Sequence, residues 1–113
     1  MSGINSEIFL DSKHLEKHLP NTGASNRLLR RGRAAHVFKD EATMRRRVAQ
    51  VIIERGTYTG FARGYERYCL MFSEAIGSRI SPDGSIMPLF YGEVKINTDN
   101  RYHPVPRVRP SEE

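Results

Sequence analysis

Cysteine is almost missing from this sequence, and long apolar runs are missing entirely. Cys69 is the only cysteine among 113 residues, so the chain cannot form an internal disulfide and is expected to be cytoplasmic. No segment approaches the ~18 consecutive apolar residues that a membrane-spanning helix requires. The first five residues also lack the basic start and apolar stretch of a secretory signal. No membrane partner is therefore expected.

Internal repeats and low-complexity tracts are missing as well. A chain of 113 residues has the usual size of one domain, and a hydrophobic fraction of 38% is sufficient for one core. We therefore expect a single domain over residues 1–113.

Acidic residues are too few to balance the basic ones. The 13 Asp and Glu residues face 18 Lys and Arg residues, which leaves a net charge of +5 and a pI near 9.7. Most of the basic residues are arginines, which keep their charge and form bidentate hydrogen bonds with phosphate oxygens. A phosphate-bearing partner explains this surplus, and so does a merely soluble basic surface. The placement of the charges must decide between them.

Capping residues predict two short helices and a strand near the N-terminus. Ser12 is suited to cap a helix that ends at Leu19, before Pro20. A second helix is expected over Ala24–Arg31, because Gly32 follows it. Ala34–Phe38 is expected to form a short strand.

The clearest helix is expected between Asp40 and Gly56. Asp40 is a good N-cap, and Gly56 stands where a C-terminal capping glycine belongs. The spacing of the apolar residues predicts a buried stripe, which comprises Met44, Val48, Val51 and Ile52. The three arginines at 45–47 lie off this stripe.

Beyond Gly56 the pattern changes from helix to loop and strand. Residues 57–66 contain two glycines and are expected to form a loop, whose Tyr58, Phe61 and Tyr65 either stack on bases or seal the core. Strands are expected over 68–72 with a continuation at 76–80, over about 86–97, and over 101–109. Pro104 and Pro106 lack backbone donors, so the last strand is expected at a sheet edge. The predicted fold class is α+β, with N-terminal helices packed on an antiparallel β-sheet meander.

The last two expected strands sort polar from apolar side chains. A three-residue loop at 98–100 pairs Lys95 with His103, Glu93 with Val105 and Tyr91 with Arg107. One face then gathers six polar residues, which are Tyr91, Glu93, Lys95, His103, Arg107 and Arg109. A solvated sheet face is the plain explanation, whereas a surface for RNA phosphates explains the excess of positive charge.

Histidines supply the second feature. His14 and His18 have the i, i+4 spacing that stacks two side chains on one helix face. Acid–base chemistry, ordinary core or surface positions, and metal ligation are three explanations, although no third metal ligand is evident. His36 lies in an apolar segment and is expected to be a satisfied buried histidine.

These residue types suit RNA cleavage without a metal or other cofactor. A base removes the 2′-hydroxyl proton, an acid protonates the leaving 5′-oxygen, and cations stabilise the crowded phosphorus centre. Histidines serve the first two roles near neutral pH, and Arg or Lys serves the third.

The early part of the chain resembles a known group of toxins. Glu16-Lys17-His18, then an arginine-rich short helix, then Val37-Phe38-Lys39-Asp40-Glu41-Ala42-Thr43, is similar to the ribonuclease-A-like C-terminal toxin domains of bacterial contact-dependent inhibition systems. The motifs are close over residues 13–43. The resemblance implies helices packed on an antiparallel sheet, as in the wider barnase–EndoU–colicin–RelE group. It also implies a catalytic role for His18 and phosphate binding by Arg27, Arg30 or Arg31. Arg107 and Arg109 occupy the place of that family's last-strand catalytic residues.

Three hypotheses follow for the function. The leading one is a metal-independent, toxin-type endoribonuclease acting on RNA, with tRNA as a candidate substrate. In it His18 is the acid or base, His103 or His14 is its partner, and the phosphate is bound by Arg107, Arg109, Lys95 and Arg101, with Tyr91 on the same face. The second is a non-catalytic RNA- or DNA-binding module. The third is an interaction protein whose basic surface binds an acidic partner such as an antitoxin or inhibitor.

Overall fold

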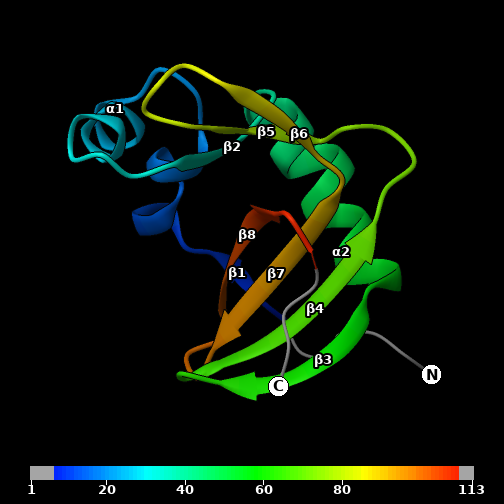
Figure 1. The fold of residues 1–113 in the computed structure, drawn as a ribbon. Coiled ribbons are helices and arrows are strands. Elements are labelled where there is room, and N and C mark those ends of the chain that lie inside the picture. Colours follow the sequence, from blue (N-terminus) through cyan, green and yellow to red (C-terminus); the bar gives the residue numbers. More distant parts are fainter. Residues whose placement is uncertain (1–6, 110–113) are drawn as a thin grey trace.

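The fold is α+β, with helical segments placed between strands along the chain (Figure 1). This structure, a computed structural model, describes residues 7–109. The helical elements are η1 (Ser12–His14), η2 (Glu16–His18), α1 (Gly23–Arg30), η3 (Thr43–Ala49) and α2 (Gln50–Arg55). The strands are β1 (Phe9–Leu10), β2 (Ala35–Phe38), β3 (Thr57–Ala62), β4 (Tyr65–Met71), β5 (Gly77–Ile80), β6 (Ile86–Leu89), β7 (Tyr91–Asn97) and β8 (Arg101–Arg107).

Two sheets replace the single meander that the sequence predicts. One is a five-stranded mixed sheet in the order β1-β8-β7-β4-β3, and the other is a three-stranded antiparallel sheet in the order β2-β5-β6. The α+β class is confirmed. The placement of all helices before the sheet is wrong, because β1 precedes them and β2 separates α1 from η3.

The segment 12–19 is not one α-helix. It forms two 3₁₀ turns, η1 and η2, and Asp11 rather than Ser12 caps the first, its side chain accepting from the Lys13 amide at 3.1 Å. Leu15 and Leu19 pack against the core. A 3₁₀ helix has about three residues per turn, so positions i and i+4 do not lie above one another. The prediction that His14 and His18 stack on one helix face is therefore wrong.

The next helix forms close to its predicted bounds. α1 begins after Thr22, whose side chain accepts from the Ser25 amide at 3.1 Å in a reciprocal capping box. It ends before Gly32, which has a φ of +75°. Such a left-handed conformation favours glycine, as the sequence predicts.

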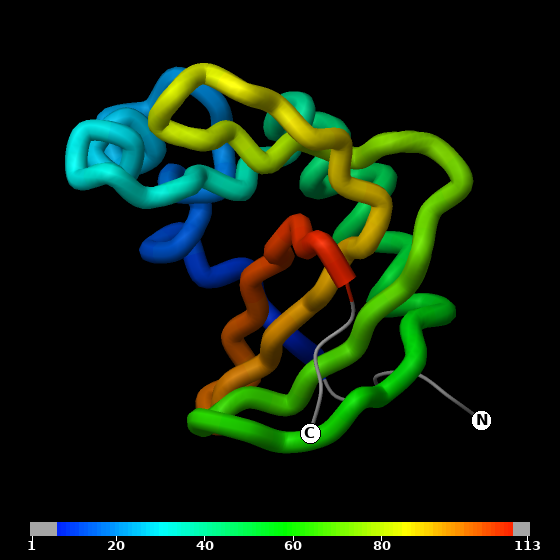
Figure 2. Tube along the Cα trace, in the orientation of Figure 1, coloured from blue at the N-terminus to red at the C-terminus, as the bar shows by residue number. Residues whose placement is uncertain are grey.

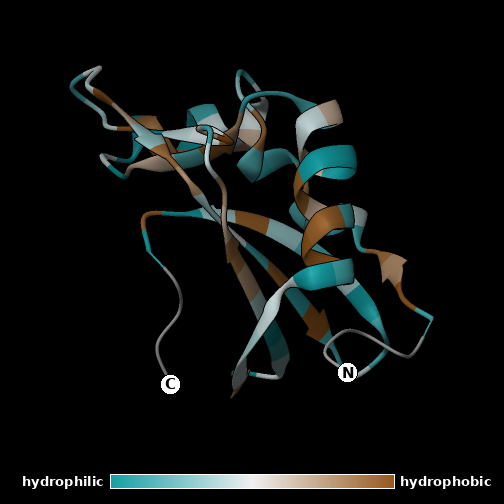
Figure 3. Cartoon of the chain, turned by 90° about the vertical axis from the view of Figure 1, so that its right-hand side faces the viewer, coloured by the Kyte–Doolittle hydropathy of each residue, from teal (hydrophilic) through white to brown (hydrophobic). Residues whose placement is uncertain are grey.

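The long helix, which η3 and α2 form together, buries three of the four residues of the predicted stripe, whereas Val51 is half-buried. The Asp40 carboxylate accepts from the Thr43 amide at 2.7 Å at its start, and Met44, Val48 and Ile52 are fully buried. Residues of η3 form π-helical turns, in which the Gln50 amide bonds to the carbonyl five residues earlier. Figure 3 shows the apolar residues of this helix facing the strands, with hydrophilic residues on its outer side.

Gly56 ends this helix for a reason that differs from the prediction. Its φ is −67° with a ψ of 154°, which is an extended and not a left-handed conformation. A Cβ at this position would lie 2.6 Å from the Ile52 carbonyl oxygen. Glycine is needed here because the chain passes close to the last helical turn.

Residues 57–66 form a hairpin, and the predicted loop is wrong. β3 and β4 pair antiparallel across a turn at Arg63 and Gly64, whose φ values are 54° and 85°. Two successive positive φ angles make the tight turn that suits a hairpin. An Arg-Gly pair is an unusual choice for it, which hides the hairpin from sequence inspection.

Two predicted long strands are each divided between the sheets. β4 ends at Met71, and β5 begins at Gly77 in the other sheet. β6 ends at Leu89, and the chain crosses at Phe90 into β7 of the five-stranded sheet. The residues on either side of the second crossing, Ile86–Leu89 and Phe90, are apolar, so the alternation of side chains does not mark the point where the chain changes sheets.

The predicted pairing of the last hairpin is confirmed. Tyr91 pairs with Arg107, Glu93 with Val105, and Lys95 with His103. The edge position is wrong, because β1 lies outside β8 and pairs with it in parallel at Arg101 and Tyr102. Figure 2 shows the N-terminal blue segment passing beside the last strand. Pro104 and Pro106 lie beyond these two pairs, where no donor is required.

The core lies between the long helix and the five-stranded sheet. Its buried cluster consists of Phe38, Met44, Val48, Ile52, Ile76, Val94 and Ile96. Gly92 lets the helix approach β7, because a Cβ there would lie 2.7 Å from a Val48 methyl group. Among residues 7–109, no helix has the length and hydropathy needed to cross a membrane.

Candidate active site

The sheet face opposite the core carries the candidate site. Cross-strand neighbours share a face, so this polar face consists of Tyr65, Arg67, Cys69, Tyr91, Glu93, Lys95, His103, Val105 and Arg107. It is not simply solvated, because Glu93 is 0% exposed and His103 is 4% exposed. Part of the N-terminal segment lies over it.

His14 covers the centre of the polar face. Its ring stacks on that of His103, with the centroids 4.3 Å apart and an angle of 30° between the planes. The ring of Tyr65 contacts that of His103 edge-on, with the ring centroids 5.2 Å apart. The Lys95 ammonium lies 5.9 Å from the centre of the Tyr65 ring. Two of the predicted histidines therefore meet, although 89 positions separate them in the sequence.

His18 is held in one orientation by the backbone of β2. Its Nδ1 lies 2.9 Å from the carbonyl oxygen of His36. A carbonyl oxygen only accepts, so Nδ1 carries the proton in this bond and Nε2 is left with a free lone pair. That atom is the one suited to remove a proton from a substrate. His36 itself is half-buried, and its backbone, not its ring, forms this contact.

All four histidines are disfavoured in their charged form. Burial lowers the pKa of His18 to about 4, despite the opposing effect of its bond to the His36 carbonyl. Burial, and then the charge of His14, lowers the pKa of His103 to about 3. Burial is also the main cause that lowers the pKa values of His14, His36 and Lys95. The site is thus a group of neutral bases among cations, an environment that favours an anion.

Glu93 was placed on the polar face from the sequence, but no role in the site was assigned to it. Its carboxylate is fully buried and lies 3.4 Å from a terminal nitrogen of Arg107. Arg107 also donates from Nε to the Arg109 carbonyl at 3.2 Å. These two contacts fix the guanidinium group at the end of β8. The acidic residue in a basic alternating strand was the signal available in the sequence.

A cavity of about 460 Å³ joins His18 to the basic end of β8. Its lining consists of His18, His36, Val105, Pro106, Arg107, Val108 and Arg109. The predicted base and the two predicted phosphate-binding arginines therefore share one cavity. Its size is that of a small-molecule pocket.

Of the other predicted site residues, some line another, smaller cavity and others are exposed outside both cavities. Arg27 and Arg31 line a smaller cavity of about 190 Å³ together with Lys17, whose charge also lowers the pKa values of the neighbouring histidines. Arg30 is exposed and lines none of these cavities, and Arg101 is exposed at the turn beside β1. Lys17 was not selected from the sequence. Tyr65, which was expected either to stack on bases or to seal the core, contacts the ring of His103. Tyr58 and Phe61 are exposed.

Comparison with known proteins places the chain in a family. The model of a family described as a domain of unknown function, DUF6972, matches residues 6–111. The chain belongs to the DUF6972 family. No curated protein and no solved structure matches it significantly. The likeness to ribonuclease toxin domains therefore stays a hypothesis.

Metal ligands do not gather in this DUF6972 chain. Among residues 7–109, no group of three His, Cys, Asp or Glu side chains has a geometry that could hold a metal ion. The two rings closest to one another, those of His14 and His103, are stacked face to face. Stacked rings do not direct two nitrogen lone pairs at one point.

The DUF6972 domain should lose stability as the pH falls from about 7 to about 4. Histidines of the unfolded chain titrate near ~6.5, whereas the pKa values of His18 and His103 in the fold are about 4 and about 3. Between these values the unfolded state binds more protons, so acid favours unfolding. Their contribution is complete above ~6.5 and is lost as the pH falls toward the folded values.

Thermal melting across this pH range measures the effect. Because carboxylates also titrate in acid, the informative comparison is between the wild type and His103→Gln. The variant should show a weaker dependence of melting temperature on pH. Identical slopes would mean that His103 is not the buried neutral base described above.

Proposed function

We propose that this chain is a metal-independent endoribonuclease of toxin type that acts on RNA, with tRNA as a candidate substrate, in the bacterial cytoplasm. One observation carries the proposal. His14 stacks on His103 at the centre of the polar face, and His18, whose charge acts on His103, lines a cavity together with Arg107. The resemblance of residues 13–43 to ribonuclease-A-like toxin domains supports the same activity.

His18 is the proposed general base. Its Nε2 accepts the 2′-hydroxyl proton, and the 2′-oxygen then attacks the adjacent phosphorus. The bond between phosphorus and the 5′-oxygen breaks, which leaves a 2′,3′-cyclic phosphate and a free 5′-hydroxyl. The bond from Nδ1 to the His36 carbonyl supports this role, because it fixes the tautomer. A pKa of about 4 keeps the imidazole neutral and able to accept a proton at pH 7.

The phosphate is proposed to bind Arg107, Arg109 and Lys95. Both arginines line the cavity that also holds His18, and Glu93 fixes the orientation of the first. Guanidinium groups bind phosphate oxygens in pairs and stabilise the charge that builds up during attack. Lys95, which is half-buried and has a lowered pKa, assists from the centre of the polar face.

His14 is the proposed acid that protonates the leaving 5′-oxygen. It is more accessible than His103, on which its ring stacks. A phosphate bound beside it favours its charged form, which offsets the burial and the charge of Lys17 that lower its pKa in the free protein. His103 acts as a positioning residue, because its ring stacks on the ring of His14 and holds it in place.

Purified protein and a short oligoribonucleotide in EDTA provide the test. We expect cleavage and a 2′,3′-cyclic phosphate product, and no cleavage of the same oligonucleotide with a 2′-deoxy sugar at the cleaved position. Salt-sensitive binding without cleavage would instead establish the non-catalytic binding module. Cleavage that EDTA abolishes would contradict the metal-independent mechanism.

A further inference from the structure

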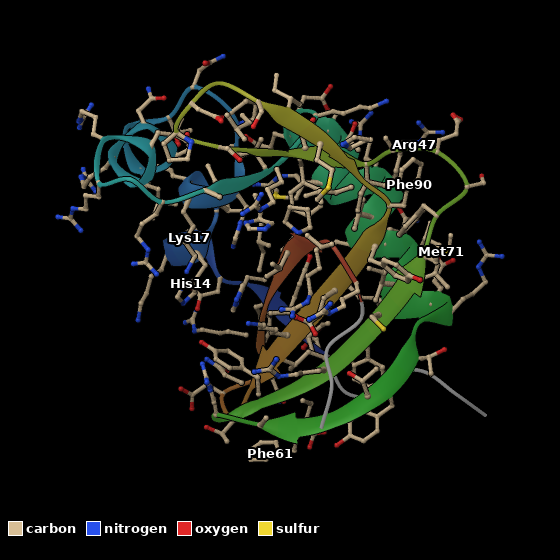
Figure 4. The ribbon with its side chains drawn as sticks, viewed as in Figure 1. His14, Lys17, Arg47, Phe61, Met71 and Phe90 are labelled. Carbon is tan, nitrogen blue, oxygen red and sulfur yellow. The ribbon has the colours of Figure 1, made fainter. Side chains whose placement is uncertain are left out.

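A second cavity lies on the side of the molecule away from the histidines. Its volume is about 510 Å³, and it is enclosed by the long helix on one side and by the segment from Leu70 to Ile76 on the other. Figure 4 shows Arg47 and Met71 on one side of the molecule and His14 and Lys17 on the other. The proposed ribonuclease activity makes no use of this cavity.

Three arginines of the long helix line the cavity, and they are not neutralised by neighbours. Arg46, Arg47 and Arg55 are exposed. Within residues 7–109, no carboxylate lies at ion-pairing distance from any of them. Glu74 is the only acidic residue of the lining, which leaves a formal surplus of two positive charges.

Arg45 provides an internal contrast. It is on the same helix and is also exposed, but it lies outside the cavity. Its Nε donates to Glu41 at 2.7 Å, one turn earlier. On this helix, the arginines that have no ion-pair partner within residues 7–109 are therefore those that line the cavity.

Apolar side chains form most of the rest of the cavity, beside Thr43 and Ser73. Val51, Leu70 and Phe72 are half-buried, and Ile76 is 4% exposed. Met71 at the rim is 63% exposed, which is unusual for a large apolar side chain. Arginines over an aliphatic floor suit a ligand that combines carboxylates with an apolar group.

We propose that this cavity binds an acidic segment of a partner protein, with one aliphatic side chain on the apolar floor and carboxylates on Arg46, Arg47 and Arg55. Charge complementarity selects an anionic partner. The lining favours a peptide ligand over a nucleic acid, because its only aromatic residue, Phe72, is half-buried and does not offer an exposed ring to a base. Single-stranded nucleic acid sites rely on exposed aromatic rings for stacking. The proposal does not depend on the ribonuclease activity.

Fluorescence anisotropy with a labelled acidic hexapeptide tests the proposal. The probe contains five glutamates around one central leucine, and its control carries serine in place of the leucine. We expect saturable binding to the wild type and weaker binding of the serine peptide. Arg47→Ala and Arg55→Ala should each weaken binding about tenfold, the effect of losing one strong charged hydrogen bond. Arg45→Ala removes the same charge from the same helix and should change the affinity less than twofold.

Three outcomes would overturn the proposal. One is the absence of saturable peptide binding to the wild type. Another is an equal loss for Arg45→Ala and Arg47→Ala, which would mean nonspecific charge attraction. The third comes from a labelled oligodeoxyribonucleotide, which the proposed chemistry cannot cleave. If Arg47→Ala and Arg55→Ala weaken its binding and leave that of the peptide unchanged, the cavity is a nucleic acid site. Equal melting temperatures of the variants exclude unfolding as the cause.

Discussion

Replacing His18 by alanine should slow RNA cleavage by about 10²–10⁴-fold, the usual contribution of a general base. The variant keeps the phosphate-binding arginines, so its affinity for an uncleavable 2′-deoxy oligonucleotide should stay within a few-fold of the wild type. It also loses the bond to the His36 carbonyl, which should cost about 1 kcal/mol of stability. Single-turnover cleavage, oligonucleotide binding and thermal melting measure the three effects separately.

Lys13→Ala is the matched control for this experiment. Lys13 belongs to the same N-terminal segment, and its side chain is exposed. The Lys13→Ala variant should therefore cleave RNA at nearly the wild-type rate. Cleavage by His18→Ala at the wild-type rate would show that another group is the base. A joint loss of affinity and melting temperature would show that His18 is structural, and the non-catalytic binding module would then be the better hypothesis.

Replacing Ile52 by alanine should reduce the free energy of unfolding by about 2–5 kcal/mol. Ile52 is fully buried between the long helix and β7. The smaller side chain leaves a cavity in the centre of the core, where the backbone cannot close around it. Chemical denaturation measures the loss as a lower midpoint with an unchanged slope.

Arg46→Ala tests the orientation of the same helix. Arg46 is exposed and has no ion-pair partner within residues 7–109, so its removal should change the free energy of unfolding by less than ~0.5 kcal/mol. Equal costs for the two substitutions would contradict the helix face described above.

Features set by neighbouring residues could be predicted from the sequence. The pairing of β7 with β8 follows from the alternation of side chains and the short turn between them, and the buried positions Met44, Val48 and Ile52 follow from their spacing. The β3–β4 hairpin was missed because Arg63 and Gly64 are not a typical pair for its turn. The division of 86–97 at Phe90 was missed because no turn residue or break in the pattern marks the crossing, and only the packing of the whole chain separates the two parts.

The candidate site, like the fold, could be predicted only where neighbouring residues determine it. Lys95, His103 and Arg107 could be placed on one face from alternation alone, and His18 was selected through a family resemblance. Their meeting depends on the parallel pairing of β1 with β8 across most of the chain, which no local pattern encodes. The lowered pKa values of His18 and His103 also arise from burial in the assembled fold. The sequence alone therefore suggested ordinary histidines that titrate near ~6.5.

Because the short strand β1 holds the histidine segment to the sheet, the local stability of that segment is lower than the stability of the whole fold. Two residue pairs and the bond from the Asp11 amide to the Tyr102 carbonyl join this strand to β8. Leu15 and Leu19 of the following segment are only partly buried at the margin of the core, whose fully buried cluster lies around the long helix and β7. The segment that carries His14 and His18 can thus detach in a partial unfolding step that leaves the core intact, at a free energy below that of global unfolding. Amide hydrogens of residues 9–19 should exchange faster than those of β7, and heating should abolish catalysis before the protein melts.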